Sequence, residues 1–287
     1  MNKIIFALSA LFVAASCGSA AEPALIAMPN SPVDLNPSEW VFSEELSDEF
    51  NVEEIDEAKW DPITNKWGPW SWERRHIYTE DGILHVAADY EPHTRGGKQL
   101  FYTSGILSSK AEFTYGYMEA RVKGCELQNG FCPAFWLRGS VKEAVNGVYY
   151  SEIDIIELQQ DENMGQIDCN LHTIVDQDGE RVWIRPKQRP DLCGNKWMAP
   201  WDAREDYHLY GCESTPEYIR WYIDGEMVIE QPNIYWHLPM KVAFSMGLRP
   251  PLLRYVGDDR VPIEENSTDE GFPTSMKVDY VRTWVRK

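Results

Sequence analysis

The chain has 287 residues, with 46 Asp and Glu against 27 Lys and Arg, a formal net charge of −19, and 12 Trp, 14 Tyr and 10 Phe. This acidity excludes a general nucleic-acid binder, because neutralising phosphates requires clustered Lys and Arg. A hydrophobic content of 43% and a charged content of 25% exclude a disordered acidic chain. The length suits one large all-β domain or two small domains.

Residues 1–21 have the pattern of an export signal, with Lys3 in a short positive start and an apolar run too short to span a bilayer. Small residues before Cys17 favour a lipoprotein-type signal with lipid on Cys17, whereas Ser19-Ala20-Ala21 favours ordinary cleavage. We therefore expect an exported protein, either a cell-surface or outer-membrane lipoprotein or a secreted protein. Removal of Lys3 lowers the 27 basic residues by one against 46 acidic residues and gives a mature charge of −20.

Residues 22–39 are rich in Pro and small residues and lack periodicity, which predicts a tether. No second linker or repeat follows, so residues 40–287 are predicted to form one catalytic domain. Alternation with a period of two recurs at 83–88, 115–123 and 277–285, and Asp224-Gly225 joins two alternating runs as a hairpin turn. No segment shows a convincing helix of three turns. The pattern predicts an all-β fold, an antiparallel β-sandwich of jelly-roll type.

Five cysteines remain once Cys17 is set aside, and their spacing matches no zinc pattern. Export permits disulfides, but an odd number leaves at least one thiol unpaired. Cys125 and Cys132 flank a polar segment that contains Gly130, so we expect a disulfide to clamp this loop. Two separate buried thiols are the alternative.

The segment 151–158 carries three carboxylates, Glu152, Asp154 and Glu157, within an apolar, β-branched strand. On a regular strand Glu152 and Asp154 face one way and Glu157 faces the other. One extra residue in a β-bulge near Ile155-Ile156 would place all three acids on one face. Glu152 and Glu157 would then bring their carboxyl groups to about 5 Å, the separation of a retaining glycosidase. Asp154 between them would raise the proton affinity of its neighbours by repulsion.

Two other interpretations of the three acids are weaker. A calcium site lacks the residue spacing of an EF-hand loop. A solvated edge strand does not fit the apolar residues that alternate with the acids. The pattern thus favours catalysis.

Glu-Ile-Asp-Ile-Ile-Glu resembles the E-x-D-x-x-E signature of glycoside hydrolase family 16, whose members are jelly-roll enzymes with an open substrate cleft. The resemblance covers the whole mature domain, including Ser47 to Phe50, Phe113 to Arg121 and Pro133 to Leu137. It implies that Glu152 is the nucleophile, Asp154 the assisting acid and Glu157 the general acid/base.

Within the family, the closest resemblance is to the κ-carrageenases. It rests on stretches outside the hexapeptide, among them Asn170-Leu171-His172-Thr173, Tyr235-Trp236-His237 and Met246-Gly247-Leu248-Arg249. The regions 67–72, 125–132 and 254–271 depart from that pattern, which leaves the exact galactan open. The resemblance implies no cofactor for the chemistry and is compatible with a structural Ca²⁺ away from the cleft.

A sulfated polysaccharide requires a locally basic cleft in a chain of this charge. Arg249 is the first candidate for a sulfate contact, because its planar fork suits a tetrahedral anion. His172 is expected beside Glu157, and Trp67 and Trp136 are expected to stack on sugar rings. Further binding candidates, each with a surface or core role as its alternative, are Trp70 and Arg138, then Trp72, Trp183, Arg74, Arg75, Arg95 and Lys98.

The sequence therefore predicts a monomeric, endo-acting retaining glycoside hydrolase that cleaves β-1,4 linkages of a sulfated galactan, with κ-carrageenan as the first candidate. A furcellaranase, β-agarase or porphyranase is the alternative within the same family. A non-catalytic glycan-binding surface lipoprotein is the alternative outside enzymes. No nucleic acid is expected as a partner, and membrane attachment is expected only through the N-terminal lipid.

Overall fold

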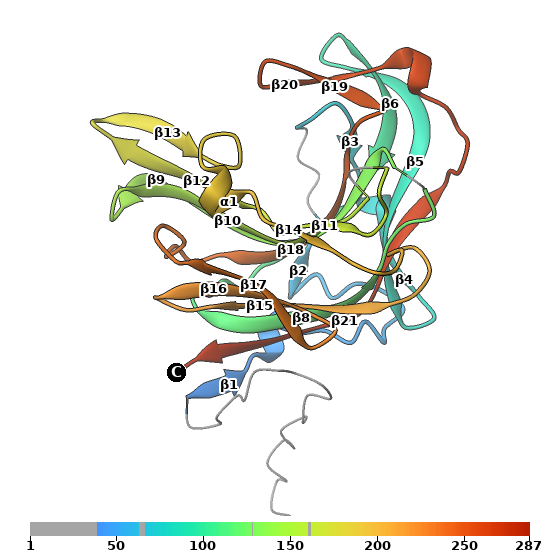
Figure 1. Ribbon diagram of the computed structural model, residues 1–287. Helices are drawn as coiled ribbons and strands as arrows, with labels where there is room; N and C mark the ends of the chain where they lie inside the picture. The colour runs from blue at the N-terminus through green and yellow to red at the C-terminus, as the bar shows by residue number, and fades with distance from the viewer. Residues whose placement is uncertain (1–38, 63–66, 128, 160–161) are drawn as a thin grey trace, which may run out of the picture.

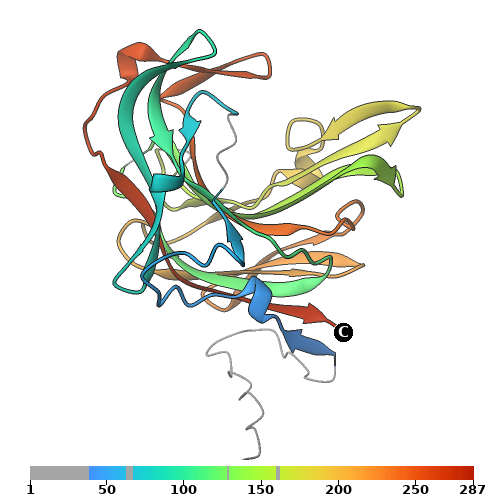
Figure 2. The same ribbon diagram turned by 180° about the vertical axis from the view of Figure 1, so that it is seen from behind.

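The computed structural model describes residues 39–62, 67–127, 129–159 and 162–287. The predicted signal 1–21, with Cys17, and nearly all of the predicted tether lie outside these residues. Two large sheets, antiparallel except for the short β3–β6 pair, pack face to face and splay apart at one end, as Figures 1 and 2 show from opposite sides. The all-β jelly-roll prediction is confirmed.

The first sheet has the strand order β17-β16-β15-β8-β21-β5-β6-β3, with β1 paired to β21 and β4 paired to β5. Its strands are β1 (Trp40–Phe42), β3 (Ser71–Trp72), β4 (Ile77–Glu80), β5 (Ile83–Arg95), β6 (Lys98–Ser104), β8 (Gly116–Lys123), β15 (His208–Ser214), β16 (Tyr218–Ile223), β17 (Glu226–Pro232) and β21 (Thr274–Arg286).

The second sheet has the order β13-β12-β10-β9-β18-β7-β2, with β11 paired to β10 and β14. Its strands are β2 (Trp60–Asp61), β7 (Ile106–Ser109), β9 (Phe131–Val145), β10 (Val148–Glu157), β11 (Gln166–Asp168), β12 (Leu171–Gln177), β13 (Glu180–Ile184), β14 (Lys196–Met198) and β18 (Lys241–Leu248). A separate hairpin is formed by β19 (Leu253–Val256) and β20 (Asp259–Pro262).

Helices are marginal in the part of the chain that the structure describes. They are the four-residue α1 (Pro190–Cys193) and the 3₁₀ turns η1 (Glu44–Leu46), η2 (Arg74–His76) and η3 (Glu264–Asn266). Within these residues no helix is long and apolar enough to cross a membrane.

The predicted Asp-Gly hairpin joins β16 to β17. Asp224 and Gly225 both have positive φ, 48° and 86°, as a type I′ turn requires. The Asp224 carboxylate also accepts hydrogen bonds from the Leu209 amide (2.9 Å) and from the His208 ring (2.7 Å). The turn is therefore held by its own backbone geometry and by hydrogen bonds to the neighbouring strand β15.

The core lies between the two sheets and is rich in aromatic side chains. Trp60, Trp70, Trp221 and Trp236 are fully buried. Phe135 of the second sheet stacks on Phe244 with ring centres 4.8 Å apart. A large share of the aromatic residues that stand out in the composition thus fills the sandwich.

The predicted Cys125–Cys132 disulfide is wrong, because both thiols are free and buried. The two side chains contact different partners. Cys125 Sγ accepts a hydrogen bond from Gln159 Nε2 at 3.4 Å, while Cys132 Sγ lies 3.5 Å from Glu157 Oε1. The alternative of two separate buried thiols describes the structure. Cys169, Cys193 and Cys212 are also free and buried.

A tryptophan from the first sheet anchors the strand that carries the acids. Trp221 of β16 donates a hydrogen bond from Nε1 to the backbone carbonyl of Asp154 on β10, at 2.9 Å and out of contact with water. This contact links the two sheets directly beneath the three carboxylates.

We expect Trp221→Phe to lower the free energy of unfolding by about 1–3 kcal/mol beyond the packing loss, since the buried Asp154 carbonyl loses its donor. Urea unfolding measures the effect. Trp40→Phe, which removes the same volume from a separate aromatic cluster, is the control. Equal destabilisation by both substitutions would show that the hydrogen bond adds nothing to the free energy of unfolding beyond packing.

Candidate active site

The three acids of β10 lie on one face because the strand contains a β-bulge. Asp154 pairs with Trp136 of β9, and the next pair is Ile156 with Phe135, so Ile155 has no partner in the register. Glu152, Asp154 and Glu157 consequently line the same cleft. The predicted bulge is confirmed, at the predicted position.

The bulge leaves backbone carbonyls outside the regular ladder, and other groups satisfy them. Trp221 donates a hydrogen bond to the Asp154 carbonyl, and the Cys169 thiol contacts the Ile155 carbonyl at 3.4 Å. The Asp154 amide donates to the Asn170 carbonyl at 2.9 Å. Because each group has a partner, the irregular backbone is stable in the interior.

The cleft has a volume of about 490 Å³ and lies on the concave face of the second sheet. It is lined by Trp67, Trp70, Trp72, Cys132, Ala134, Trp136, Arg138, Tyr150, Glu152, Asp154, Glu157, Asn170, His172, Trp183, Arg185, Ser245, Gly247, Arg249, Tyr255 and Arg260. The three predicted acids and all the predicted binding residues except Arg74, Arg75, Arg95 and Lys98 are in this set. The sequence alone did not single out Tyr150, Asn170, Arg185, Tyr255 or Arg260 as site residues.

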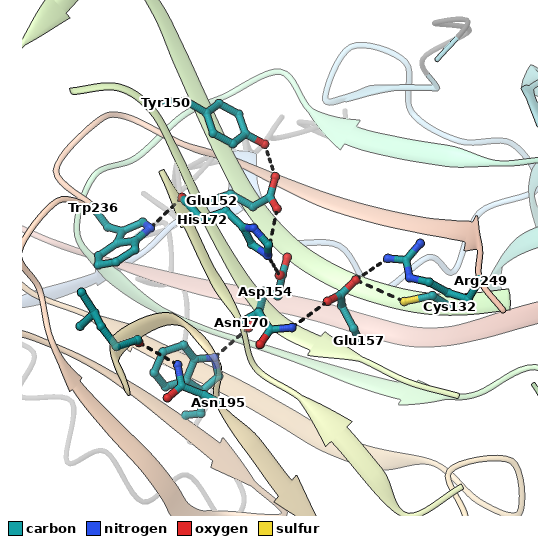
Figure 3. A network of polar contacts seen from close by, with 12 residues as sticks. Cys132, Tyr150, Glu152, Asp154, Glu157, Asn170, His172, Asn195, Trp236 and Arg249 are labelled. Carbon is teal, nitrogen blue, oxygen red and sulfur yellow. Dashed lines mark hydrogen bonds and ion pairs between the residues drawn. The ribbon is translucent and has the colours of Figure 1, made fainter. Parts of the chain in front are cut away.

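Glu152 and Asp154 share one cation, His172. The register places His172 of β12 directly opposite Glu152, and its Nε2 lies 3.3 Å from Asp154 Oδ2 and 3.8 Å from Glu152 Oε1 (Figure 3). The expectation that His172 would lie beside Glu157 is wrong in this respect. The hydroxyl of Tyr150 donates a short hydrogen bond to the other Glu152 oxygen.

Glu157 has a different set of partners. Arg249 Nη2 contacts Oε1 at 2.5 Å, the Cys132 thiol contacts the same oxygen at 3.5 Å, and Asn170 Nδ2 contacts Oε2 at 3.3 Å (Figure 3). Arg249, expected to bind sulfate, forms an ion pair with a carboxylate in this structure, and its contact with sulfate stays a prediction. Both side chains of that pair are nearly buried, with 13% and 12% exposed.

The neighbouring groups shift the pKa values of Asp154 and Glu157 in opposite directions. Burial, followed by repulsion from Glu157 and Glu152, raises the pKa of Asp154 well above its usual range. Burial also acts to raise the pKa of Glu157, but the positive charges of Arg249 and His172 outweigh it and lower that pKa.

Burial would lower the pKa of His172, but the negative charges of Glu152 and Asp154 raise it to about 9. His172 is therefore an imidazolium at neutral pH.

Among the described residues, Glu152, Asp154 and His172 are the one group of three acidic, His or Cys side chains close enough to share a metal ion, with ligand atoms within 4.8 Å. A metal needs a neutral imidazole, whereas His172 holds its proton up to a pKa of about 9. The group therefore fits an ion-pair cluster better than a metal centre. The structural Ca²⁺ expected away from the cleft stays a prediction.

The cleft tryptophans have two roles. Trp67 and Trp183 are each 40% exposed and offer free faces to a ligand. Trp70 and Trp72 pack beneath Trp67, with ring centres 5.4 and 4.9 Å from it, and are buried. The expectation that Trp70 contacts substrate as a platform is therefore wrong, since its ring supports Trp67.

Trp136, expected to stack on sugar rings, is 8% exposed and lies in the floor of the cleft. Its Nε1 donates to Ser245 Oγ at 3.1 Å, which fixes the ring beside Asp154 in the strand register.

Four arginines line the cleft: Arg138, Arg185, Arg249 and Arg260. The other basic candidates act elsewhere. Arg74 and Arg75 pair with surface glutamates, which is the surface alternative considered for them. Arg95 donates to the carbonyls of Trp70 (2.5 Å) and Gly68 (2.6 Å) and so holds the loop that carries Trp67. Lys98 lines an adjoining hollow of about 730 Å³ beyond Trp67 and Arg260.

The β19–β20 hairpin closes one side of the cleft. Asp258, at its tip, lies 2.8 Å from Arg185 and 3.7 Å from Lys187, which follow β13. Figure 1 shows this hairpin reaching from the β5–β6 side toward β12 and β13. Sequence analysis missed the hairpin, although the turn at Gly257 between alternating residues was a signal for it.

An antiparallel sandwich whose cleft joins clustered carboxylates to aromatic platforms has the organisation of a polysaccharide-degrading enzyme. The chain belongs to glycoside hydrolase family 16, because the family model described as "Beta-porphyranase A-D, GH16 domain" matches residues 40–286.

Among relatives, the κ-carrageenase of Pseudoalteromonas carrageenovora is 40% identical over 261 residues, 86% of this chain and 65% of that protein. Its crystal structure with a κ-carrageenan oligotetrasaccharide has a TM-score of 0.82 at 39% identity and covers 90% of this chain and 99% of that chain.

A κ-carrageenase structure from Zobellia galactanivorans has a TM-score of 0.81 at 37% identity and covers 90% of this chain and 100% of that chain. Porphyranase B from the same organism has a TM-score of 0.69 at 22% identity, with coverage of 90% and 97%, a likeness in fold.

The raised pKa of His172 predicts a pH-dependent contribution to stability. Its folded pKa of about 9 exceeds the ordinary value of 6.5, so the contribution is complete below pH 6.5 and is lost as pH rises through about 9. We expect the free energy of unfolding to fall over this window in the wild type and to fall less in His172→Gln. Urea unfolding at several pH values measures this, and parallel curves for the two proteins would contradict it.

Proposed function

We propose that the protein is an endo-acting, retaining glycoside hydrolase that cleaves β-1,4 linkages of a sulfated galactan, with κ-carrageenan as its substrate. The observation that carries the proposal is the bulged strand β10, which presents Glu152, Asp154 and Glu157 to one cleft. The identity of 40% to a κ-carrageenase supports the substrate. This chain spans 65% of that relative. We therefore infer the activity and substrate of this protein from the domain that the two chains share.

In the proposed mechanism the Glu152 carboxylate attacks the anomeric carbon while Glu157 gives its proton to the departing glycosidic oxygen. A covalent glycosyl-enzyme results. Glu157 then removes a proton from water, the water oxygen attacks the anomeric carbon, and the Glu152 carboxylate leaves. The chemistry requires no cofactor.

Asp154 and His172 balance charge during these steps. The imidazolium of His172 contacts both Glu152 and Asp154, which stabilises the negative charge of the attacking carboxylate. When Glu152 becomes an ester, it loses that charge, and its repulsion on Glu157 disappears. The pKa of Glu157 then falls, which suits its change from acid to base.

We expect Glu157→Gln to lower kcat by about 10²–10⁴-fold, the usual contribution of general acid–base catalysis, and Glu152→Gln to abolish turnover. Reducing-end assays on κ-carrageenan measure both. On an aryl glycoside, whose leaving group departs without protonation, added azide should restore activity to Glu157→Ala, because a small nucleophile can open the glycosyl-enzyme without a base. Near-normal hydrolysis by Glu152→Gln would contradict the assignment.

Arg249 connects the charge of the substrate to the acid. In the free enzyme its guanidinium lowers the pKa of Glu157, against the effect of burial. A sulfate ester that draws Arg249 away would raise the pKa of Glu157 and favour its protonated form.

The pH profile of kcat/KM tests this connection, since it reports groups of the free enzyme. Arg249→Met should move the alkaline limb of that profile to higher pH, because the cation that lowers the pKa of Glu157 is gone. The same variant should lose affinity for the sulfated polymer. An unchanged limb would show that Arg249 does not control the proton of Glu157.

A β-porphyranase is the second candidate, favoured by the family model that matches residues 40–286. A panel of κ-carrageenan, furcellaran, porphyran and agarose separates the candidates, and the polymer with the highest kcat/KM identifies the substrate. Binding without hydrolysis of any polymer would support a non-catalytic glycan-binding protein instead.

The proposal includes export, because a polysaccharide of this size is met outside the cell. Residues 1–21 serve as the signal, and Cys17 carries the lipid if the lipoprotein route is used. Membrane fractionation of the wild type and of Cys17→Ser distinguishes an anchored protein from a freely secreted monomer.

A further inference from the structure

A second hollow, of about 220 Å³, adjoins the catalytic cleft on the concave face of the second sheet. It is lined by Glu112, Arg138, Gly139, Ser140, Tyr150 and Lys241. Arg138 and Tyr150 line the cleft as well, so the two spaces lie side by side. A ligand in the cleft can therefore extend into this hollow.

The strand register brings two positive charges together there. Arg138 of β9 is the direct partner of Lys241 on β18 and, on its other side, of Glu152 on β10. Directly opposed residues of antiparallel strands point to the same face, with Cβ atoms about 4.5–5.5 Å apart. Like charges in this arrangement repel each other, which disfavours the pair unless an anion joins it.

Two carboxylates lie near this pair, Glu152 opposite Arg138 and Glu112 in the hollow, but neither neutralises it through a close contact. Among the described residues no ion pair involves Arg138, its buried Nε has no hydrogen-bond partner, and its guanidinium lies 5.7 Å from the ring centre of Trp136. Lys241 reaches Glu112 only at 3.9 Å, and those side chains are 34% and 50% exposed. An exposed pair at that distance contributes little.

We propose that Arg138 and Lys241 form a second anion subsite, which binds a sulfate ester of the same polysaccharide chain that occupies the cleft. The inference rests on the proposed function. Arg249 contacts Glu157, and Arg138 is in register with Glu152, so the two cationic points flank the two catalytic carboxylates. The enzyme would thus recognise charge on both sides of the reacting bond.

Arg138 has a competing role, since it neighbours Glu152 and could stabilise that carboxylate directly. Lys241 separates the two roles, because it lies on β18, one strand further from β10. A loss caused by Lys241→Met therefore reports binding of the polymer anion. Lys142, exposed on the same strand as Arg138 and outside both hollows, provides the matched control.

The test compares purified wild type, Lys241→Met, Arg138→Met and Lys142→Met on the sulfated polymer that the wild type hydrolyses fastest and on its desulfated form. On the sulfated polymer we expect KM to rise about fivefold for Lys241→Met and more for Arg138→Met, with kcat of Lys241→Met within twofold of wild type. Lys142→Met should match the wild type. The salt dependence of kcat/KM should weaken for both cleft variants.

On the desulfated polymer Lys241→Met should equal the wild type, and Lys241→Arg should keep normal KM on the sulfated one. An unchanged KM for Lys241→Met, or an equal loss on both polymers, would overturn the subsite. Fastest hydrolysis of agarose by the wild type would overturn it as well, since that polymer offers no sulfate. Failure of the wild type on every polymer would instead refute the proposed hydrolase function, and unchanged binding of sulfated oligosaccharides by Lys241→Met would then refute the subsite.

Discussion

Three carboxylates within six residues of one strand face a single cleft, and the structure depends on balancing their repulsion. Asp154 is 4% exposed, and Glu152 and Glu157 are only partly exposed, so water can screen them little. Two cations do this instead. His172 lies between Glu152 and Asp154, and Arg249 lies against Glu157.

This division makes the two sides of the site unequal. Glu152 has an imidazolium and the Tyr150 hydroxyl, a set that suits the attacking anion of the proposed mechanism. Glu157 has a guanidinium, whose position the proposed sulfated substrate would change. In the proposed mechanism, the same residues that stabilise the fold around buried acids therefore also set the order of proton transfer. His172 and Arg249 would then combine a structural and a catalytic role.

The sequence predicted the sandwich, the hairpin at Asp224-Gly225 and the bulge, because each rests on a local rule about backbone geometry or side-chain alternation. It failed where the outcome depended on which strands pair. His172 was expected beside Glu157, but the β10–β12 register places it opposite Glu152. Trp70 was expected in contact with substrate, but Trp67 packs over it. The two thiols of Cys125 and Cys132 contact different residues, Gln159 and Glu157. The spacing of the cysteines in the chain could not reveal these contacts.

Net charge proved to be a poor guide to the ligand for the same reason. A charge of −19 is spread over the whole chain, whereas a ligand responds to charges within a Debye length of about 8 Å at physiological salt. Surface arginines such as Arg74 and Arg75 are neutralised by neighbouring glutamates, while four arginines converge on the cleft. If the substrate is the proposed sulfated chain, the surface acids would repel it outside the cleft, while the four arginines would attract it to the site proposed for hydrolysis.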